Sequence, residues 1–421
     1  MSISSNIITT SEHSAKKIGK RALEEIKVVS EVLPFRVNEY VCDSLIDWDN
    51  YRDDPIYRLT IPNKSMLTNE QYEKIKKGLA LGRESIRPIV EEIRSELNPH
   101  PGDQLKMNIP EVGGIPVSGL QHKYERTVLY FPSSGQVCHS YCTFCFRWAQ
   151  FIGDKPLRME SKEITDLLEY VRANRNITDI LITGGDPMVM KTSNLRKMIE
   201  PLLGKDFLHV ENIRIGSKAL TFWPQRFVTD SDSDDLLNLF RKVTISGKHL
   251  AFMAHYNHPK EMSTEISDRA IAAIQSTGAV IRSQGPLLKG INDNPDNWAN
   301  LWRAQVHRGI VPYYMFVERD TGANNCFSVP LWEAYNIFHK SIRVTSGLAR
   351  TVRGPVMSTK YGKVEILHYE PGENGNFLMQ FIQHRDSTRV KIPFKSKYSG
   401  SASWFDELIP FAEADSPFFK Y

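Results

Sequence analysis

Apolar and polar residues follow two different periods along the chain, and the period changes near residue 119. Before that point, apolar positions recur every three or four residues among charged ones, as in "NEQYEKIKKGLALGRESIRPIVEEIRSEL". This spacing is typical of amphipathic helices. Proline and glycine then interrupt the pattern in "NPHPGDQ" and "PEVGGIPVSG". We therefore predict a mainly helical region over residues 1–118 that ends in a linker.

Short apolar runs rich in β-branched and aromatic residues follow the linker. Six of them begin at Thr127 (TVLYFP), Ile177 (ITDILIT), Asn212 (NIRIGS), His249 (HLAFMAHY), Ala279 (AVIRSQG) and Val311 (VPYYMFV). Helix-like segments such as "SDDLLNLFRKV" and "TEISDRAIAAIQSTG" separate the later runs. This alternation predicts an α/β protein with a parallel sheet of right-handed βα units. Since eight units close a TIM barrel, we expect a partial, open (β/α)6 TIM-type barrel over residues 119–320.

The remaining residues, 321–421, combine a helix-like segment, "VPLWEAYNIFHKSI", with the β-like runs "KVEILHYE" and "FLMQFIQH". We predict a C-terminal α+β extension that covers the barrel.

Polar motifs directly follow each of the six expected strands. In chain order they are a cysteine cluster, "TGGDP", "GSK", "HYNHP", "QGPLLKGIND" and "ERD". The loops after the strands of a parallel α/β barrel share one face, on which catalytic residues lie. We therefore expect the six motifs to converge in space.

Composition narrows the class of protein. The 421 residues, 41% of them apolar, are enough to bury a large core. The net charge of +4 arises from interspersed charges without a block of one sign, so nucleic acid is not an expected partner. There is no apolar run of membrane-spanning length, and the polar start "MSISSNIITTSEHSAKK" lacks the apolar core of a secretory signal. We expect a cytoplasmic protein that does not associate with membranes.

Three of the five cysteines, Cys138, Cys142 and Cys145, lie in one loop with the spacing C-x-x-x-C-x-x-C. An odd total argues against a disulfide framework. A structural zinc site would need a fourth protein ligand, either His139, which is too close to its neighbour for the usual spacing, or a remote His or Cys. An iron–sulfur cubane accepts three thiolates and leaves one iron open. Structural zinc and plain core packing remain the alternative interpretations.

This cysteine spacing after the first strand of a βα barrel resembles the radical S-adenosylmethionine superfamily. The resemblance implies a [4Fe–4S] cluster on the three cysteines, S-adenosylmethionine on the open iron, and a 5′-deoxyadenosyl radical that abstracts hydrogen. It also implies a one-electron reductant such as flavodoxin or ferredoxin. A glycine-rich turn binds the cofactor's methionyl amine in that superfamily, which makes Gly184, Gly185 and Asp186 candidates. The alternative for these three residues is an ordinary tight turn.

A closer resemblance, over roughly residues 55–360, is to lysine 2,3-aminomutase and its relatives. It is carried by "GLQHKY", the cysteine run with its following arginine, "ITGGDP", "IRIGSK", "HYNHP", "LLKGIND", "PYY" and "GPVM", in that order. It implies that Ser217, His255 and Gln284 line the S-adenosylmethionine pocket. It also implies that Arg147 binds the α-carboxylate of the substrate, which suits the guanidinium fork. A structural ion pair is the alternative for Arg147.

The chain departs from that family at the pyridoxal phosphate site. The family's imine-forming lysine precedes a Pro-Val-Met segment, whereas this chain reads "TSGLARTVRGPVMST", with Arg353 as the nearest basic residue. Arginine stays protonated and cannot form the imine. Lys360 and Lys363 lie a few residues further on. The family's C-terminal zinc cysteines are also missing, since only Cys326 follows the cysteine cluster.

We interpret the chain as a divergent radical S-adenosylmethionine enzyme that abstracts hydrogen from an amino acid or amino-acid-derived substrate without covalently bound pyridoxal phosphate. Glu318 and Asp320 lie where the lysine enzymes hold the distal amine, although both suit a solvated loop equally well. One alternative is a pyridoxal phosphate-dependent 2,3-aminomutase whose imine lysine is Lys360 or Lys363. Another is a non-catalytic or nucleic-acid-binding protein held together by zinc. Homo-oligomerisation is left open.

Overall fold

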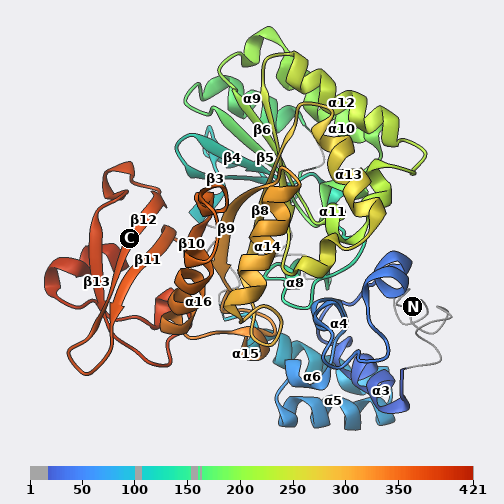
Figure 1. Ribbon diagram of the computed structural model, residues 1–421, viewed down its shortest axis with the longest axis vertical. Coiled ribbons are helices and arrows are strands. Elements are labelled where there is room, and N and C mark those ends of the chain that lie inside the picture. The colour runs from blue at the N-terminus through green and yellow to red at the C-terminus, as the bar shows by residue number, and fades with distance from the viewer. Residues whose placement is uncertain (1–17, 100–106, 153–159, 162–163, 421) are drawn as a thin grey trace.

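The computed structural model describes residues 18–99, 107–152, 160–161 and 164–420. Its centre is an eleven-stranded sheet that runs in the order β13-β12-β11-β10-β9-β8-β7-β6-β5-β4-β3 (Figure 1). The central strands are β4 (Thr127–Tyr130), β5 (Asp179–Ile182), β6 (Asn212–Ser217), β7 (His249–His255), β8 (Val280–Leu287), β9 (Val311–Val317) and β10 (Arg353–Ser358). The flanking strands are β3 (Leu120–Tyr124), β11 (Gly362–Glu370), β12 (Asn376–His384) and β13 (Pro393–Lys397). A separate hairpin joins β1 (Glu111–Val112) and β2 (Ile115–Pro116).

The six predicted strands are all present and pair in parallel from β4 to β9, which confirms the α/β class and the open barrel. The structure adds β10, which pairs in parallel with β9 and extends the parallel set by one strand. Register aligns Val128, Ile180, Ile213 and Leu250 across four neighbouring strands. All four side chains are buried in one core with the surrounding helices. Alternation along the strands therefore places one face of the sheet against helices.

Helices cover this outer face, as the chain pattern predicts. They are α9 (Thr165–Ala173), α10 (Thr192–Ile199), α12 (Ser233–Ile245), α13 (Glu265–Gln275), α14 (Pro295–His307) and α16 (Leu331–Arg343). Three short helices, α8 (Trp148–Phe151), α11 (Ala219–Phe222) and α15 (Asn324–Phe327), lie in the connecting loops. Within the described ranges, none of the helices is long and apolar enough to cross a membrane.

The N-terminal region is helical, with α3 (Lys20–Val29), α4 (Pro55–Thr60), α5 (Asn69–Leu81) and α6 (Arg83–Glu96). The long periodic segment forms two helices rather than one. Thr68 and Gln71 cap the start of α5 reciprocally, and Gly82, at φ 112°, ends it in a conformation that favours glycine. This region shares a hydrophobic core with Phe144 and Trp148 of the cysteine loop. It therefore packs on the carboxyl ends of the parallel strands, at the lower right of Figure 1.

The C-terminal strands β11 to β13 pair in antiparallel fashion and continue the same sheet. The sheet curls so far that β12 comes to lie beside β3, the strand at the opposite edge. Lys123 on β3 donates a hydrogen bond to the carbonyl of Thr359 in the turn before β11. The predicted boundary at residue 320 therefore falls inside one continuous sheet.

Candidate active site at the carboxyl ends of the parallel strands

The loop that carries the three cysteines has irregular backbone between β4 and α8, and the N-terminal region holds it in place. The amide of Tyr141 donates to the carbonyl of Arg36 (2.8 Å), and the amide of Thr143 donates to the carbonyl of Leu59 (3.0 Å). The Arg36 guanidinium in turn donates to the carbonyl of Cys138 (3.1 Å). An irregular loop needs such external partners because it cannot satisfy its own backbone groups.

The three thiols are free and part-buried. Burial raises the pKa of Cys142 to about 12 and that of Cys145 to about 11. Burial also raises the pKa of Cys138 well above its usual value, and the negative charges of Asp186 and of the other two thiols add to the effect. Thiolates at this position therefore need a compensating cation. In the described part of the chain, no group of three or more His, Cys, Asp or Glu side chains is arranged as a preformed metal site.

The glycine turn after β5 lies directly against the start of the cysteine loop. A Cβ at Gly185 would lie 2.5 Å from the carbonyl oxygen of Val137, and one at Gly184 would lie 2.4 Å from Nε2 of Gln136. Only glycine permits this approach. The sequence suggests that these residues let the backbone approach a ligand; in the structure they let two loops of the chain itself meet.

Asp186 links three loops through one buried carboxylate, which is 2% exposed. It accepts hydrogen bonds from the amide of Met188 (2.9 Å), the hydroxyl of Ser217 (2.8 Å) and the amide of Lys218 (2.9 Å). Nε2 of His139 lies 3.9 Å from the same carboxylate. Asp186 and Ser217, both candidates for cofactor binding, are thus brought together and bond to each other.

Arg147 is held in a part-buried position by neutral acceptors. Its guanidinium donates to the carbonyl of Gly184 (2.6 Å) and to the side-chain oxygens of Gln136 (3.1 Å) and Gln150 (2.5 Å). It also lies over the ring of Phe131, 4.5 Å from the centroid. Burial lowers the pKa of Arg147 to about 10, although two of the cysteines oppose the shift. No carboxylate of the described residues pairs with Arg147, so its charge remains available to an anion.

His255, the last residue of β7, lies opposite Gln284 in the middle of β8. Nε2 of His255 is buried and has no hydrogen-bond partner among the described residues. Burial and the charge of Lys218 lower the pKa of His255 well below its usual value, so the ring is neutral. Its edge faces Phe144 of the cysteine loop, with the ring centroids 5.7 Å apart. A buried imidazole without a partner indicates an unfilled ligand contact.

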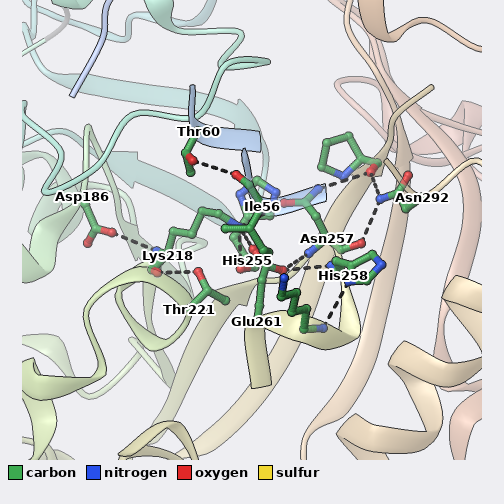
Figure 2. Close-up of polar contacts among 12 residues, drawn as sticks. Ile56, Thr60, Asp186, Lys218, Thr221, His255, Asn257, His258, Glu261 and Asn292 are labelled. Atoms are coloured by element: carbon green, nitrogen blue, oxygen red, sulfur yellow. Dashed lines mark hydrogen bonds and ion pairs between the residues drawn. The ribbon is translucent and has the colours of Figure 1, made fainter. Parts of the chain in front are cut away.

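A buried ion pair holds the loops after β6, β7 and β8 together (Figure 2). Lys218 donates to Glu261 (2.7 Å) and to the side-chain oxygen of Asn257 (3.0 Å). Glu261 also accepts from the backbone amides of Asn257 (2.5 Å) and His258 (2.9 Å). Asn292 extends the network by donating to the carbonyl of Asn257 (3.0 Å). The sequence motifs contain Lys218, Asn257, His258 and Asn292 but not Glu261, and a pattern does not reveal an ion pair between residues 43 positions apart.

The loop after β9 reaches the cysteine loop through Trp148, whose indole donates to the hydroxyl of Thr321 (3.1 Å). Glu318 in this loop is buried, and burial raises its pKa well above its usual value. Its negative charge would in turn raise the pKa of Cys145, so the two groups are neighbours. Asp320 is part-buried. Glu318 is therefore not the solvated loop charge that the sequence left open.

The two lysines considered as replacements for the imine lysine occupy different environments. Lys363 points between the rings of Tyr124 and Tyr314, with its ammonium 4.6 Å and 5.8 Å from the centroids. Burial lowers its pKa to about 7. Lys360 contacts the ring of Tyr361 instead, at 5.3 Å. Arg353, the basic residue nearest the Pro-Val-Met segment, is exposed at the start of β10.

Polar loops that converge around three thiols, at the carboxyl edge of a parallel sheet, define an enzyme of the α/β-barrel class. Comparison with known proteins then identifies the family. The chain is 34% identical over 395 residues to a protein of Aquifex aeolicus described as "Putative L-lysine 2,3-aminomutase", with 93% of this chain and 92% of that protein covered. The chain therefore belongs to the lysine 2,3-aminomutase family of radical S-adenosylmethionine enzymes.

More distant relatives carry two different substrate names. L-lysine 2,3-aminomutase of Methanococcus maripaludis is 27% identical and covers 77% of this chain and 64% of its own length. Glutamate 2,3-aminomutase of Clostridioides difficile is 26% identical and covers 82% of this chain and 71% of its own length. No protein-family model matches the chain.

Two solved structures of radical S-adenosylmethionine enzymes can be compared with this one, both at low TM-scores of 0.32 and 0.36. Streptococcus suis SuiB bound to its precursor peptide SuiA has a TM-score of 0.36 and 12% identity, and covers 74% of this chain and 68% of its own. A TM-score this low does not assign a fold, which the sheet topology already defines.

Replacing Glu261 by glutamine should lower the free energy of unfolding by about 3–5 kcal/mol, because it leaves the buried ammonium of Lys218 without a counter-charge. Urea denaturation measures the change. The exposed pair of Arg87 and Glu91, 3.1 Å apart, is the matched control, and Glu91→Gln should change stability by less than about 0.5 kcal/mol. Equal effects of the two substitutions would contradict the prediction.

The depressed pKa of Lys363 predicts a pH dependence of stability. Between its unfolded value of 10.5 and its folded value of about 7, the unfolded chain binds a proton that the folded chain does not. Stability should therefore rise with pH across this window, relative to Lys363→Met, and be flat below about 7. Denaturation of both proteins at about pH 7 and about pH 10 measures the difference. A wild type that loses stability relative to the variant as pH rises would contradict the assignment.

Proposed function

We propose that this protein is a radical S-adenosylmethionine enzyme that abstracts hydrogen from an amino acid or an amino-acid-derived substrate. The observation that carries the proposal is the cysteine loop. Cys138, Cys142 and Cys145 offer three soft donors from one loop, and His139 of the same loop lies with its Nε2 3.9 Å from the carboxylate of Asp186. This donor set suits a cluster that takes three thiolates and keeps one iron open better than a closed zinc tetrahedron.

In this proposal the three cysteines hold a [4Fe–4S] cluster, which, when loaded with S-adenosylmethionine and reduced, supplies a 5′-deoxyadenosyl radical. His255 offers its unpartnered Nε2 to the cofactor, and Gln284 lies beside it. Asp186 acts by fixing Ser217 and the glycine turn, Gly184 and Gly185, in place. A one-electron reductant such as flavodoxin or ferredoxin supplies the electron.

For the substrate, we propose a carboxylate bound by the guanidinium of Arg147. The guanidinium of Arg147 has no acidic partner among the described residues, and the neutral groups to which it donates fix its orientation. Glu318 and Asp320 would contact the substrate from the loop after β9. We also propose that the helical region (1–118), the barrel (119–320) and the C-terminal extension (321–421) are three functional divisions of the chain. The strands of the barrel and of the extension belong to one sheet.

Anaerobic reconstitution with iron and sulfide tests the cluster. We expect about four iron atoms and matching acid-labile sulfide per chain in the wild type, and loss of most of this iron in Cys142→Ala. Cys326→Ala is the matched control, since Cys326 is also part-buried but lies outside the loop, so it should retain the iron. One zinc per chain without iron would refute the proposal.

Substrate identification follows from the reconstituted protein. Incubation with dithionite, S-adenosylmethionine and deuterated amino acids should transfer deuterium into 5′-deoxyadenosine for the true substrate class. Arg147→Lys should raise KM more than it lowers kcat, because a single ammonium cannot replace the bidentate fork.

A second candidate function is a pyridoxal phosphate-dependent aminomutase, and the position of Lys363 favours it over Lys360 as the imine lysine. Lys363 is buried and its pKa is about 7, so a large fraction of its amine is unprotonated and able to attack an aldehyde near neutral pH. On this reading, borohydride should fix pyridoxal phosphate to the wild type and to Lys360→Met, but not to Lys363→Met. A protein that never retains the cofactor would eliminate this candidate.

A further inference from the structure

Two lysines from opposite ends of the sheet meet at one aromatic ring. Lys123 on β3 and Lys363 on β11 place their ammonium groups 5.5 Å and 4.6 Å from the ring centroid of Tyr124. Lys123 donates to the carbonyl of Thr359, and Lys363 donates to the side-chain oxygen of Gln383 (2.5 Å). Both hydrogen-bond acceptors are neutral, so neither ammonium is compensated by its own bond.

The charges that face the two lysines are mainly positive. Burial lowers the pKa of Lys123 well below its usual value, and the positive charges of Lys363, Arg319 and Arg385 lower it further. Lys363 faces the positive charge of Arg214, which lowers its pKa, and the negative charge of Asp179, which raises it. That carboxylate is already engaged, because Arg214 donates to its two oxygens at 2.8 Å and 2.7 Å.

In the described ranges, no carboxylate forms an ion pair with either lysine. Two like charges set side by side away from bulk water, without a counter-ion, are unfavourable unless an anion binds or a proton leaves. Both lysine side chains are part-buried, so each keeps some exposure to solvent.

We propose that Lys123 and Lys363, whose ammonium groups both lie close to the ring of Tyr124, form a binding site for an oxyanion inside the barrel. The ligand we assign to it is an acidic group of the substrate other than its α-carboxylate, and this identity rests on the proposed function. The site would select amino acids with a second acidic group over those with a distal amine. A phosphate group has the same chemistry and is the other source to be distinguished.

Binding of inorganic phosphate to the iron-free protein tests the site without any radical chemistry. We expect calorimetry to detect phosphate binding to the wild type, and Lys123→Gln or Lys363→Gln to weaken it by about tenfold or more, since each removes one charged hydrogen bond. Lys363→Arg keeps the charge and should retain binding. Lys360→Gln, three positions before Lys363 in the turn that precedes β11, is the matched control and should behave as the wild type.

Thermal melting in phosphate-free buffer separates a binding role from a structural one. Because Lys363→Gln relieves repulsion, it should melt no lower than the wild type and should lose the stabilisation that phosphate gives. A variant that melts clearly lower, or that binds phosphate as the wild type does, would overturn the proposal.

Competition identifies the source of the anion. Displacement of phosphate by glutarate assigns the site to a substrate carboxylate, and displacement by pyridoxal 5′-phosphate without covalent fixation assigns it to a phosphate; both support the anion site. Fixation of pyridoxal phosphate to Lys363 by borohydride overturns it in favour of an imine. Because all of these measurements use iron-free protein, failure of the radical function would leave their outcome unchanged.

Discussion

Parallel pairing of β4 to β10 is the constraint on which the rest of this structure depends. Hydrogen bonding in a parallel ladder makes every strand end at the same edge of the sheet, so loops that are far apart in sequence must meet there. The cysteine loop, the glycine turn and the loop after β9 touch one another for this reason, through Arg147, Gly185 and Trp148. Such convergence builds a site from short segments, none of which could form one alone.

The edge is polar and buried, so its side chains must satisfy one another. Asp186 and Glu261 each accept several hydrogen bonds, and each joins the end of one strand to its neighbour. Part of the polarity is therefore structural and fixes the backbone around the thiols. Among the groups left over in the described residues are His139 and His255, which have ring nitrogens without a hydrogen-bond partner, and Arg147, which has only neutral partners. Polar groups that the protein itself does not satisfy are the ones that we expect to contact a ligand.

Inside the barrel, two lysines lie close to one aromatic ring, and neither forms an ion pair with a carboxylate of the described residues. Lys123 and Lys363 both lie close to the ring of Tyr124, in a sheet whose C-terminal strands curl back until β12 lies beside β3. Lys363 is part-buried, whereas Arg353, the basic residue nearest the Pro-Val-Met segment, is exposed. The two residues lie on neighbouring antiparallel strands, β11 and β10.

The sequence by itself determined the α/β class, the six strands and the cysteine loop, because apolar period, turn residues and ligand spacing are local properties. It also led to the aminomutase family through short ordered motifs. It did not reveal β10, the partnership of Lys218 with Glu261 or the meeting of Lys123 with Lys363. Those depend on which strands become neighbours and how far the sheet curls. Only tertiary structure decides this, since burial and long-range packing set the energy of each charge.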